Sequence, residues 1–235
     1  MTGCVTGKHE MMARGKPMAA NGSNSFGIRD NYSRGKVADF IKEKVSAGSK
    51  LSIVSAYFTI YAYESLSDQL DQVEELHFLF GEPRFISSLD PEKTDKKSFK
   101  IEDEGLELAN RLQQKEIARR CATWIRDRVE IRSVKQANLL HGKLYHIDDG
   151  RREHAILGSS NFTQRGLGLS ATPNIELNLI VDGDRDRAEL KEWFEQIWSD
   201  DKLVEDVKDE VLRYLEQLYV NHSPEFIYFK TLFHV

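Results

Sequence analysis

Apolar residues recur along the chain in patterns that predict alternating helices and strands. A helical spacing over residues 36–45 is followed by a compact apolar run over residues 50–58, which predicts a strand. A helix over residues 62–70 and a second strand over residues 73–81 come next, and a Gly-Glu-Pro turn ends that strand. Because a helix separates the two strands, we expect them to pair in parallel.

The second half of the chain continues this alternation. The charged segment over residues 84–100 contains an Asp-Pro pair, so we expect an exposed connection there. Beyond it, apolar spacing predicts a long amphipathic helix from residue 101 to about residue 126. Further strands are expected over residues 129–134, 139–147, 153–158 and 174–181, and further helices over residues 184–198 and 203–219. This order indicates an α/β fold.

The composition fits one folded domain between two differently composed ends. With 235 residues, 40% of them hydrophobic, the chain can bury the core of a single α/β domain. Residues 1–30 are rich in Gly, Ser and Asn without sustained periodicity, which predicts a flexible lead-in. We expect the folded domain over residues 31–220. Residues 221–235 end in an apolar run, so we expect an extension that leads into a further domain.

The sequence also bears on the cellular compartment. No apolar run approaches the roughly 18 to 20 residues that cross a bilayer, and the N-terminus lacks the apolar segment of a signal peptide. Cys4 and Cys121 are too far apart for a disulfide framework or a metal-ligand spacing. We therefore expect a cytoplasmic protein without membrane contact and without a bound metal.

One cluster of residues carries recognisable chemistry. His141 and Lys143 are two residues apart in an expected strand, so their side chains should point to the same face. Ser159 and Asn161, also two residues apart, can both donate hydrogen bonds toward one point. Together these four side chains can surround a phosphate. Glu176 begins the neighbouring strand, where its carboxylate can hold one ring nitrogen of His141.

The order of these residues resembles the pattern of the phospholipase D superfamily. That pattern is His-x-Lys, then Asp, then Gly-Ser-x-Asn and a later Glu, and it is matched here by His141, Lys143, Asp148, Gly158, Ser159, Asn161 and Glu176. The sequence just after Asn161 looks most like the nuclease-type members. Nine residues separate Asp148 from Gly158, three more than in the commonest pattern, which we interpret as a longer hairpin. The resemblance implies a mixed sheet flanked by helices on both faces, with a catalytic domain over residues 31–220.

The resemblance also implies a mechanism. His141 would attack phosphorus to give a phosphohistidine, while Lys143, Ser159 and Asn161 hold the non-bridging oxygens. No metal or other cofactor is required. A second histidine must protonate the leaving oxygen, but the motif occurs once, and each other histidine lacks a lysine two residues later: His9, His77, His146, His154, His222 and His234. We therefore expect a homodimer in which His141 of both protomers meets at one site.

Several residues near the motif have two interpretations. Asp148 ends its strand, so we expect it to cap the hairpin or form a structural pair rather than contact phosphate. Gly158 would let backbone approach a ligand. Arg151 and Arg152 belong either to a solvated turn or to a nucleic-acid contact beside the site. Arg165 is either a surface residue or a phosphate contact.

Charge is unevenly distributed. The net charge of −5 and the pI of about 5.9 argue against a protein surrounded by positive field. Basic residues nevertheless concentrate between Arg111 and Lys135, among them Arg126 and Arg128. This segment is either a solvated helix face or a basic strip for a phosphate backbone.

Three functional classes fit these features. A DNA nuclease is favoured by the basic segment and the hairpin arginines. The alternatives are a phospholipase or phosphatidyl transferase, and a nucleic-acid-binding module that has kept the fold. The chain also resembles the N-terminal modules that precede helicase cores in restriction and defence proteins, so we expect DNA as partner and a helicase domain on the same chain.

Overall fold

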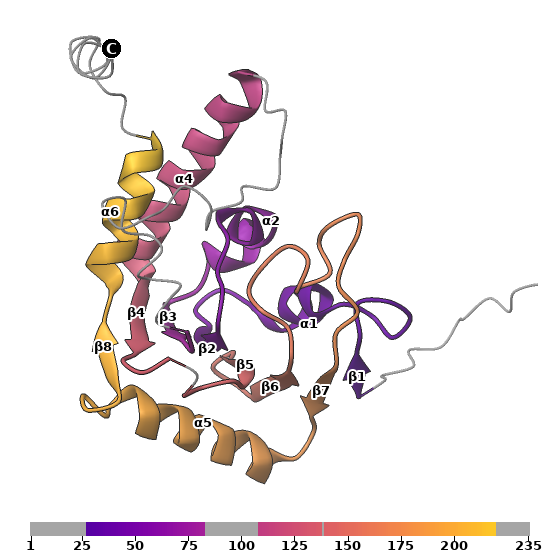
Figure 1. Ribbon diagram of the computed structural model, residues 1–235. Helices are drawn as coiled ribbons and strands as arrows, with labels where there is room; N and C mark the ends of the chain where they lie inside the picture. The colour runs from indigo at the N-terminus through magenta and orange to yellow at the C-terminus, as the bar shows by residue number, and fades with distance from the viewer. Residues whose placement is uncertain (1–26, 83–107, 138, 220–235) are drawn as a thin grey trace, which may run out of the picture.

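A mixed sheet of eight strands forms the centre of the computed structural model, which describes residues 27–82, 108–137 and 139–219 (Figure 1). The strands are β1 (Ile28–Arg29), β2 (Lys50–Ser55), β3 (Glu75–Phe80), β4 (Val129–Val134), β5 (Lys143–Asp148), β6 (Glu153–Gly158), β7 (Asn178–Val181) and β8 (Val204–Asp206). Their spatial order is β1-β7-β6-β5-β2-β3-β4-β8. Strands β2, β3 and β4 pair in parallel, which confirms the parallel pairing predicted for the first two, and the other neighbours pair antiparallel.

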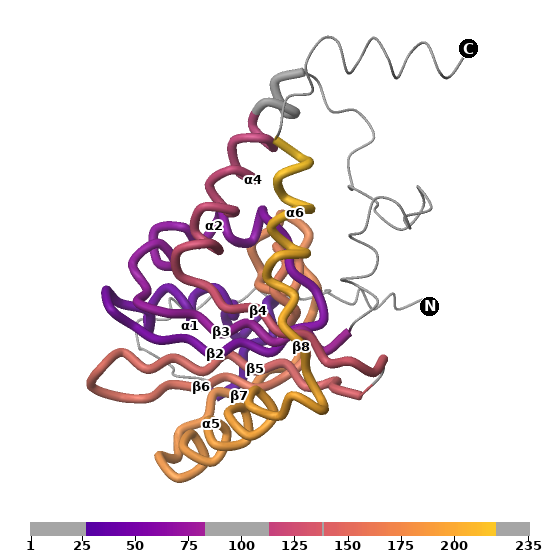
Figure 2. The backbone as a smooth tube through the Cα atoms, turned by 90° about the vertical axis from the view of Figure 1, so that its left-hand side faces the viewer, coloured from indigo at the N-terminus to yellow at the C-terminus, as the bar shows by residue number. Residues whose placement is uncertain are grey.

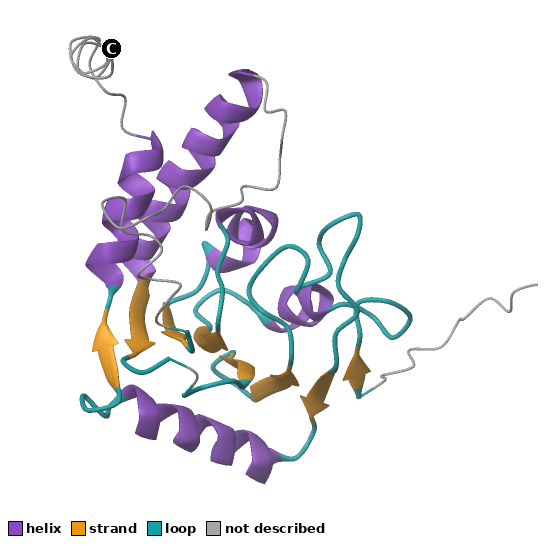
Figure 3. Ribbon diagram, viewed as in Figure 1, coloured by secondary structure: helices purple, strands orange, loops and turns teal. Residues whose placement is uncertain are grey.

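Helices cover both faces of this sheet (Figures 2 and 3). One face packs against α1 (Val37–Lys44), α2 (Ile60–Leu70), α4 (Leu108–Arg128) and α6 (Lys208–Tyr219). The opposite face packs against α5 (Asp184–Trp198). The predicted α/β architecture, a mixed sheet flanked by helices on both faces, is therefore confirmed.

Side-chain alternation along the strands divides the apolar residues between two cores. On β2, Ile53 packs in the larger core with α1, α2, α4 and α6, whereas its neighbour Val54 packs in the smaller core under α5. On β5, Tyr145 lies in the larger core and Leu144 in the smaller one. A strand residue in the larger core therefore faces α1, α2, α4 and α6, and one in the smaller core faces α5.

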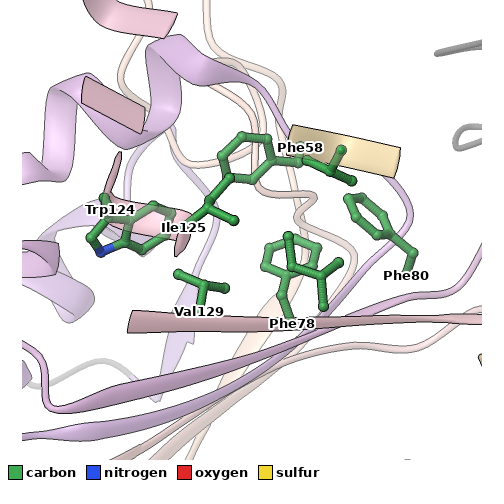
Figure 4. A pocket seen from close by; sticks show the side chains of 8 residues that line it. Phe58, Phe78, Phe80, Trp124, Ile125 and Val129 are labelled. Carbon is green, nitrogen blue, oxygen red and sulfur yellow. The ribbon is translucent and has the colours of Figure 1, made fainter. Parts of the chain in front are cut away.

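The larger core contains an aromatic-lined space between the sheet and α4 (Figure 4). Phe78 and Phe80 of β3 and Phe58, which follows β2, face Trp124 and Ile125 of α4 across it. Phe58 also stacks on Phe162, with ring centroids 5.4 Å apart. Aromatic packing therefore connects the end of β2 to the loop after β6. Within the described ranges, none of the helices combines the length and apolar character needed to cross a bilayer.

Some element boundaries differ from the sequence-based expectations. Strand β5 begins at Lys143 rather than residue 139, and β7 begins at Asn178 rather than residue 174. The helix expected over residues 203–219 is divided: residues 204–206 form strand β8, and helix α6 begins only at Lys208. Residues 28–29, assigned to a flexible lead-in, form β1 on β7. The expected connection over residues 84–100, the start of the long helix and the extension over residues 221–235 lie outside the described residues.

We predict that Phe162→Ala destabilises the fold substantially. Phe162 is 1% exposed, and replacing a buried phenylalanine by alanine typically costs about 3 to 5 kcal/mol. The free energy of unfolding measured in urea should fall by this amount, whereas Tyr32→Ala, at a side chain that is 79% exposed, should leave it nearly unchanged. Equal urea midpoints for Phe162→Ala and the parent protein would contradict this packing.

Candidate active site

The motif residues gather at one edge of the sheet. This edge holds the carboxyl ends of β2 and β3, the start of β5 and the end of β6. In the register, Leu144 lies opposite Val54 of β2, and Lys143 lies directly opposite Gly158 of β6. The two halves of the motif, separated by 14 residues in sequence, are thus brought together by the β5–β6 hairpin.

His141 lies just before β5, not within it, so the prediction that it shares a strand with Lys143 was wrong. The physical reason is that the ladder ends: the last paired residues on either side are Val54 and Gly158. His141 is exposed, and its backbone carbonyl accepts a hydrogen bond from Nζ of Lys143 at 2.9 Å. A hydrogen bond from the lysine side chain to the histidine backbone, rather than the alternation of a strand, therefore connects the two residues.

Gly81 positions the segment that leads to His141. A Cβ atom at this residue would lie 2.5 Å from the backbone carbonyl oxygen of Leu140, so only glycine permits this close approach. Its backbone N–H also donates to the carbonyl of Ser55 at 3.0 Å. In the sequence this glycine indicated a strand end, and nothing there revealed its contact with Leu140.

Ser159 and Glu176 are joined by hydrogen bonds. The Ser159 hydroxyl donates to Oε2 of Glu176 and accepts from the backbone N–H of Leu177 at 3.0 Å. The side-chain amide of Asn174 donates to Oε1 of Glu176 at 3.2 Å. Both carboxylate oxygens therefore have donors within this loop. That Glu176 orients His141 stays a prediction.

The backbone N–H of Glu176 donates to the carbonyl of Asp30 at 3.0 Å. The Asp30 carboxylate in turn accepts from the backbone N–H groups of Tyr32, Ser33 and Arg34. These amides, that of Arg34 above all, lower the pKa of Asp30 to about 2. Asp30 belongs to the segment predicted to be a flexible lead-in, so its support of the site was missed.

Asn161 is anchored to the end of β2. Its Oδ1 accepts from the backbone N–H of Ala56 at 3.0 Å and from the hydroxyl of Ser55 at 3.3 Å. Because Oδ1 is the acceptor, the Nδ2 donor is directed away from these groups. Ser55 itself is fully buried; its hydroxyl donates to the carbonyl of Tyr57 at 2.7 Å and accepts from the backbone N–H of Phe162 at 2.9 Å.

Two buried side chains, those of Asn178 and Tyr145, form hydrogen bonds with Ser160 in the loop between Gly158 and Phe162. Asn178 accepts from the backbone N–H of Ser160 at 3.2 Å and donates to the Ser160 hydroxyl at 2.9 Å. The Tyr145 hydroxyl donates to the Ser160 carbonyl at 2.9 Å, and burial raises the pKa of Tyr145. An asparagine in an otherwise apolar strand was a signal for such a role, since asparagine is depleted in strands.

Gly158 permits close chain packing, and its expected role in the approach of a ligand stays a prediction. A Cβ atom there would lie 2.3 Å from the carbonyl oxygen of Leu177 and 2.4 Å from Oδ1 of Asn178. The glycine therefore lets the segment that carries Glu176 lie against the end of β6.

Asp148 and the hairpin arginines lie at the opposite end of β5. Five strand steps of about 3.3 Å place Asp148 roughly 17 Å from Lys143 along the strand. Asp148 accepts from the backbone N–H of Gly150 at 2.9 Å, at the hairpin turn, and lies 3.7 Å from Nζ of Lys191. The interpretation that Arg151 and Arg152 lie beside the site was wrong, because both belong to this distant turn.

The hairpin turn is organised by Asp149. Its carboxylate accepts from the backbone N–H groups of Arg151 and Arg152 at 2.8 Å each and contacts Nε2 of His154 at 3.2 Å. The amide of Arg152 is the largest cause of a pKa of about 2 for Asp149. The turn thus satisfies its own polar groups, far from the motif.

Basic residues of α4 form internal contacts. Arg126 pairs with Glu216 at 3.2 Å, and Arg128 donates to the carbonyl of Val73, which precedes β3 and so lies at the edge opposite the motif. Further along the helix, Arg120 pairs with Glu64 at 3.0 Å. These pairings favour the interpretation as a structural helix face over that of a basic strip.

Arg165 is the candidate arginine closest to the motif in sequence. It is exposed in the loop that follows Asn161, and its backbone carbonyl accepts from the N–H of Asn174 at 3.1 Å. Because Asn174 also donates to Glu176, Arg165 lies on the same network as the site.

The other histidines within the described ranges lie away from this edge. His146 is 2% exposed in the middle of β5 on the face under α5, and burial lowers its pKa. His154 belongs to the hairpin end, and His77 stacks on Trp198 with ring centroids 4.5 Å apart. Within the same ranges, no three His, Cys, Asp or Glu side chains are grouped so that they could hold a metal ion.

We predict that Gly158→Ala displaces the segment carrying Glu176. The added methyl would overlap the carbonyl of Leu177. The free energy of unfolding measured in urea should therefore fall by about 1 to 3 kcal/mol. The matched control is Gly142→Ala, because a Cβ there has nothing within 4 Å. Equal free energies of unfolding for the two variants would contradict the close approach of Leu177 and Asn178 to Gly158.

No match is found among the curated proteins. A polyphosphate kinase from Porphyromonas gingivalis superposes with a TM-score of 0.42 at 10% identity, over 77% of this chain and 25% of that one. Phosphatidylserine synthase from Haemophilus influenzae Rd KW20 gives 0.47 at 11% identity, over 82% and 43%. The chain thus spans less than half of either protein.

A family model provides the assignment. The model described as "Cardiolipin synthase, PLD-like domain" matches residues 41–198, well over half of the chain. This range contains each motif residue from His141 to Glu176, together with Ser55 and Gly81, which lie at the same sheet edge. The chain therefore belongs to the PLD-like domain family, within the phospholipase D superfamily of phosphodiester-acting enzymes.

Proposed function

We propose that the protein is a metal-independent phosphodiesterase that cleaves the DNA backbone. The observation that carries this proposal is the placement of Lys143 directly opposite Gly158, which brings His141 and Lys143 to the same sheet edge as Ser159 and Asn161. A nucleophile and two hydrogen-bond donors, Nζ of Lys143 and Nδ2 of Asn161, then lie at one sheet edge, which is the kind of arrangement that phosphoryl transfer needs.

The proposed reaction has two displacements. A ring nitrogen of His141 attacks phosphorus, a nitrogen–phosphorus bond forms, and the bond to the leaving oxygen breaks while a second histidine supplies that oxygen with a proton. Water then attacks phosphorus, the nitrogen–phosphorus bond breaks, and the second histidine takes up the proton of the water. Lys143 and Nδ2 of Asn161 offset the charge of the non-bridging oxygens in both steps.

The second histidine comes, in this proposal, from a second copy of the chain. Within the described ranges, His77, His146 and His154 lie away from the motif edge. A two-fold axis that passes near the exposed His141 would place the same residue of both protomers on opposite sides of one phosphate.

Nucleic acid is the proposed substrate because of the groups that flank the site. Tyr57 follows β2 next to the amide that anchors Asn161, and its side chain is 48% exposed, so its ring can stack on a base. Arg165 is exposed on the network of Glu176, where its guanidinium can contact a neighbouring phosphate. Such contacts carry little base specificity.

The acidic chain suits a module that another domain delivers to DNA. With a net charge of −5, it has little general attraction for a polyanion. A DNA translocase on the same chain would supply a high effective concentration instead. We therefore propose that the domain is the nuclease module of a larger helicase-containing protein.

We predict that the protein cleaves plasmid DNA in EDTA and that His141→Ala lowers the rate by at least about 10³-fold, because it removes the nucleophile. The matched control, His154→Ala at the far end of the hairpin, should retain the parent rate. Cleavage is followed by gel electrophoresis. Parent-level activity of His141→Ala would overturn the proposal, and hydrolysis of phospholipid without DNA cleavage would reassign the substrate.

A further inference from the structure

An apolar stripe is exposed beside the motif. We define it as Leu157 of β6, Leu179 of β7, and Leu177 and Ile175 of the segment that leads into β7. These side chains are 38%, 55%, 68% and 75% exposed, respectively. Large aliphatic side chains that are exposed side by side, rather than singly, mark interaction sites on proteins.

The register places the stripe on the face of the sheet that packs against α5. Leu157 and Leu179 lie directly opposite one another, and so share a face. One step further from the motif on this face, the paired residues Ala155 and Val181 pack with Phe194 of α5. Helix α5 thus covers this face at one end and leaves it bare at the end nearest the motif.

The stripe is connected to the catalytic groups through the backbone. Ser159 donates its N–H to the carbonyl of Leu177 at 3.1 Å, and the Ser159 hydroxyl accepts from the N–H of Leu177 at 3.0 Å. Glu176 lies between two members of the stripe in sequence, and its charge acts on Tyr145, which belongs to the opposite face. A partner on the stripe would therefore lie directly behind the catalytic edge.

We propose that the apolar stripe is the surface on which a second copy of this chain docks. The inference rests on the proposed function, since a site with one histidine is incomplete without that copy. Two-fold docking is isologous, so the stripe of one protomer would pack against that of its partner. Four aliphatic side chains supply the apolar centre of an interface, which in stable complexes buries about 800 Å² per partner.

Other occupants fit the surroundings less well. The helix that borders the stripe is acidic at positions that face solvent, namely Asp184, Asp186, Glu189, Glu192 and Glu195. These carboxylates would repel an anionic membrane surface. A substrate entrance would open on the face of Lys143, which by strand alternation is that of Tyr145, whereas Leu157 and Leu179 share the face of Ala155.

The test is the oligomeric state of the full chain, measured by sedimentation velocity over a concentration series. The parent protein should sediment as a dimer. The double variant Leu177→Lys/Leu179→Lys should raise the dimer dissociation constant by at least about 100-fold, since it places charges at the centre of the interface. The matched control is Leu203→Lys, at a leucine that is 38% exposed, as Leu157 is, but outside the stripe. It should remain dimeric.

A second variant keeps the result independent of folding. Ile175→Lys lies outside regular structure at a side chain that is 75% exposed, so it should weaken the dimer while far-UV circular dichroism and the urea midpoint stay at parent values. A monomeric parent, or stripe variants that dimerise as tightly as the parent, would overturn the inference. Binding of a monomeric parent to phosphatidylglycerol vesicles, lost in the stripe variants, would overturn it in favour of a membrane surface.

The outcome is separable from that of the proposed function. A stripe-dependent dimer without any diesterase activity would support the docking surface and contradict the nuclease. Cleavage by a monomer would support the nuclease activity but contradict both the docking surface and the site shared by two copies.

Discussion

The buried hydroxyl of Ser55 is the interaction on which the site depends. It lies at the carboxyl end of β2 and contacts the backbone of Tyr57 and Phe162 and the side chain of Asn161. The single O–H of this buried hydroxyl donates to the carbonyl of Tyr57, with Oδ1 of Asn161 as a longer second acceptor, and its oxygen accepts from the backbone N–H of Phe162. Through it the end of β2, the aromatic core and the motif side chain of Asn161 are held together.

The motif residues and the polar residues that serve the fold lie at opposite edges of the sheet. The motif occupies one sheet edge, and the hairpin turn and the end of α4 occupy the other. Charged groups at the second edge form hydrogen bonds and ion pairs with other residues of the chain, as Asp149 does with Arg151 and Arg126 with Glu216. The site edge keeps polar groups that face solvent beside an apolar surface, which is the combination that a shared site would use.

Local periodicity predicted most of the elements because each buries one face against a neighbour. The parallel pairing of β2 and β3 and the helices on both faces followed from that pattern and from the resemblance. The gathering of Lys143 and Gly158 followed from the hairpin, because its two strands must end together.

What the sequence could not reveal are contacts between distant segments. The start of β5 depends on where its neighbours end, and the need for Gly81 depends on Leu140, which lies 59 residues away. The same holds for Asn178, whose partners are Arg29 and Ser160, and for Arg126, whose charge is offset by Glu216. Counts of basic residues therefore overstated the positive surface.

A covalent phosphohistidine at His141 would leave its mark in the stereochemistry of cleavage. A phosphodiester made chiral by sulfur substitution at phosphorus is hydrolysed in ¹⁸O-water, and the configuration of the product is determined. Each displacement inverts phosphorus, so two displacements predict overall retention. Overall inversion would mean that water attacks the diester directly and that no phosphohistidine forms.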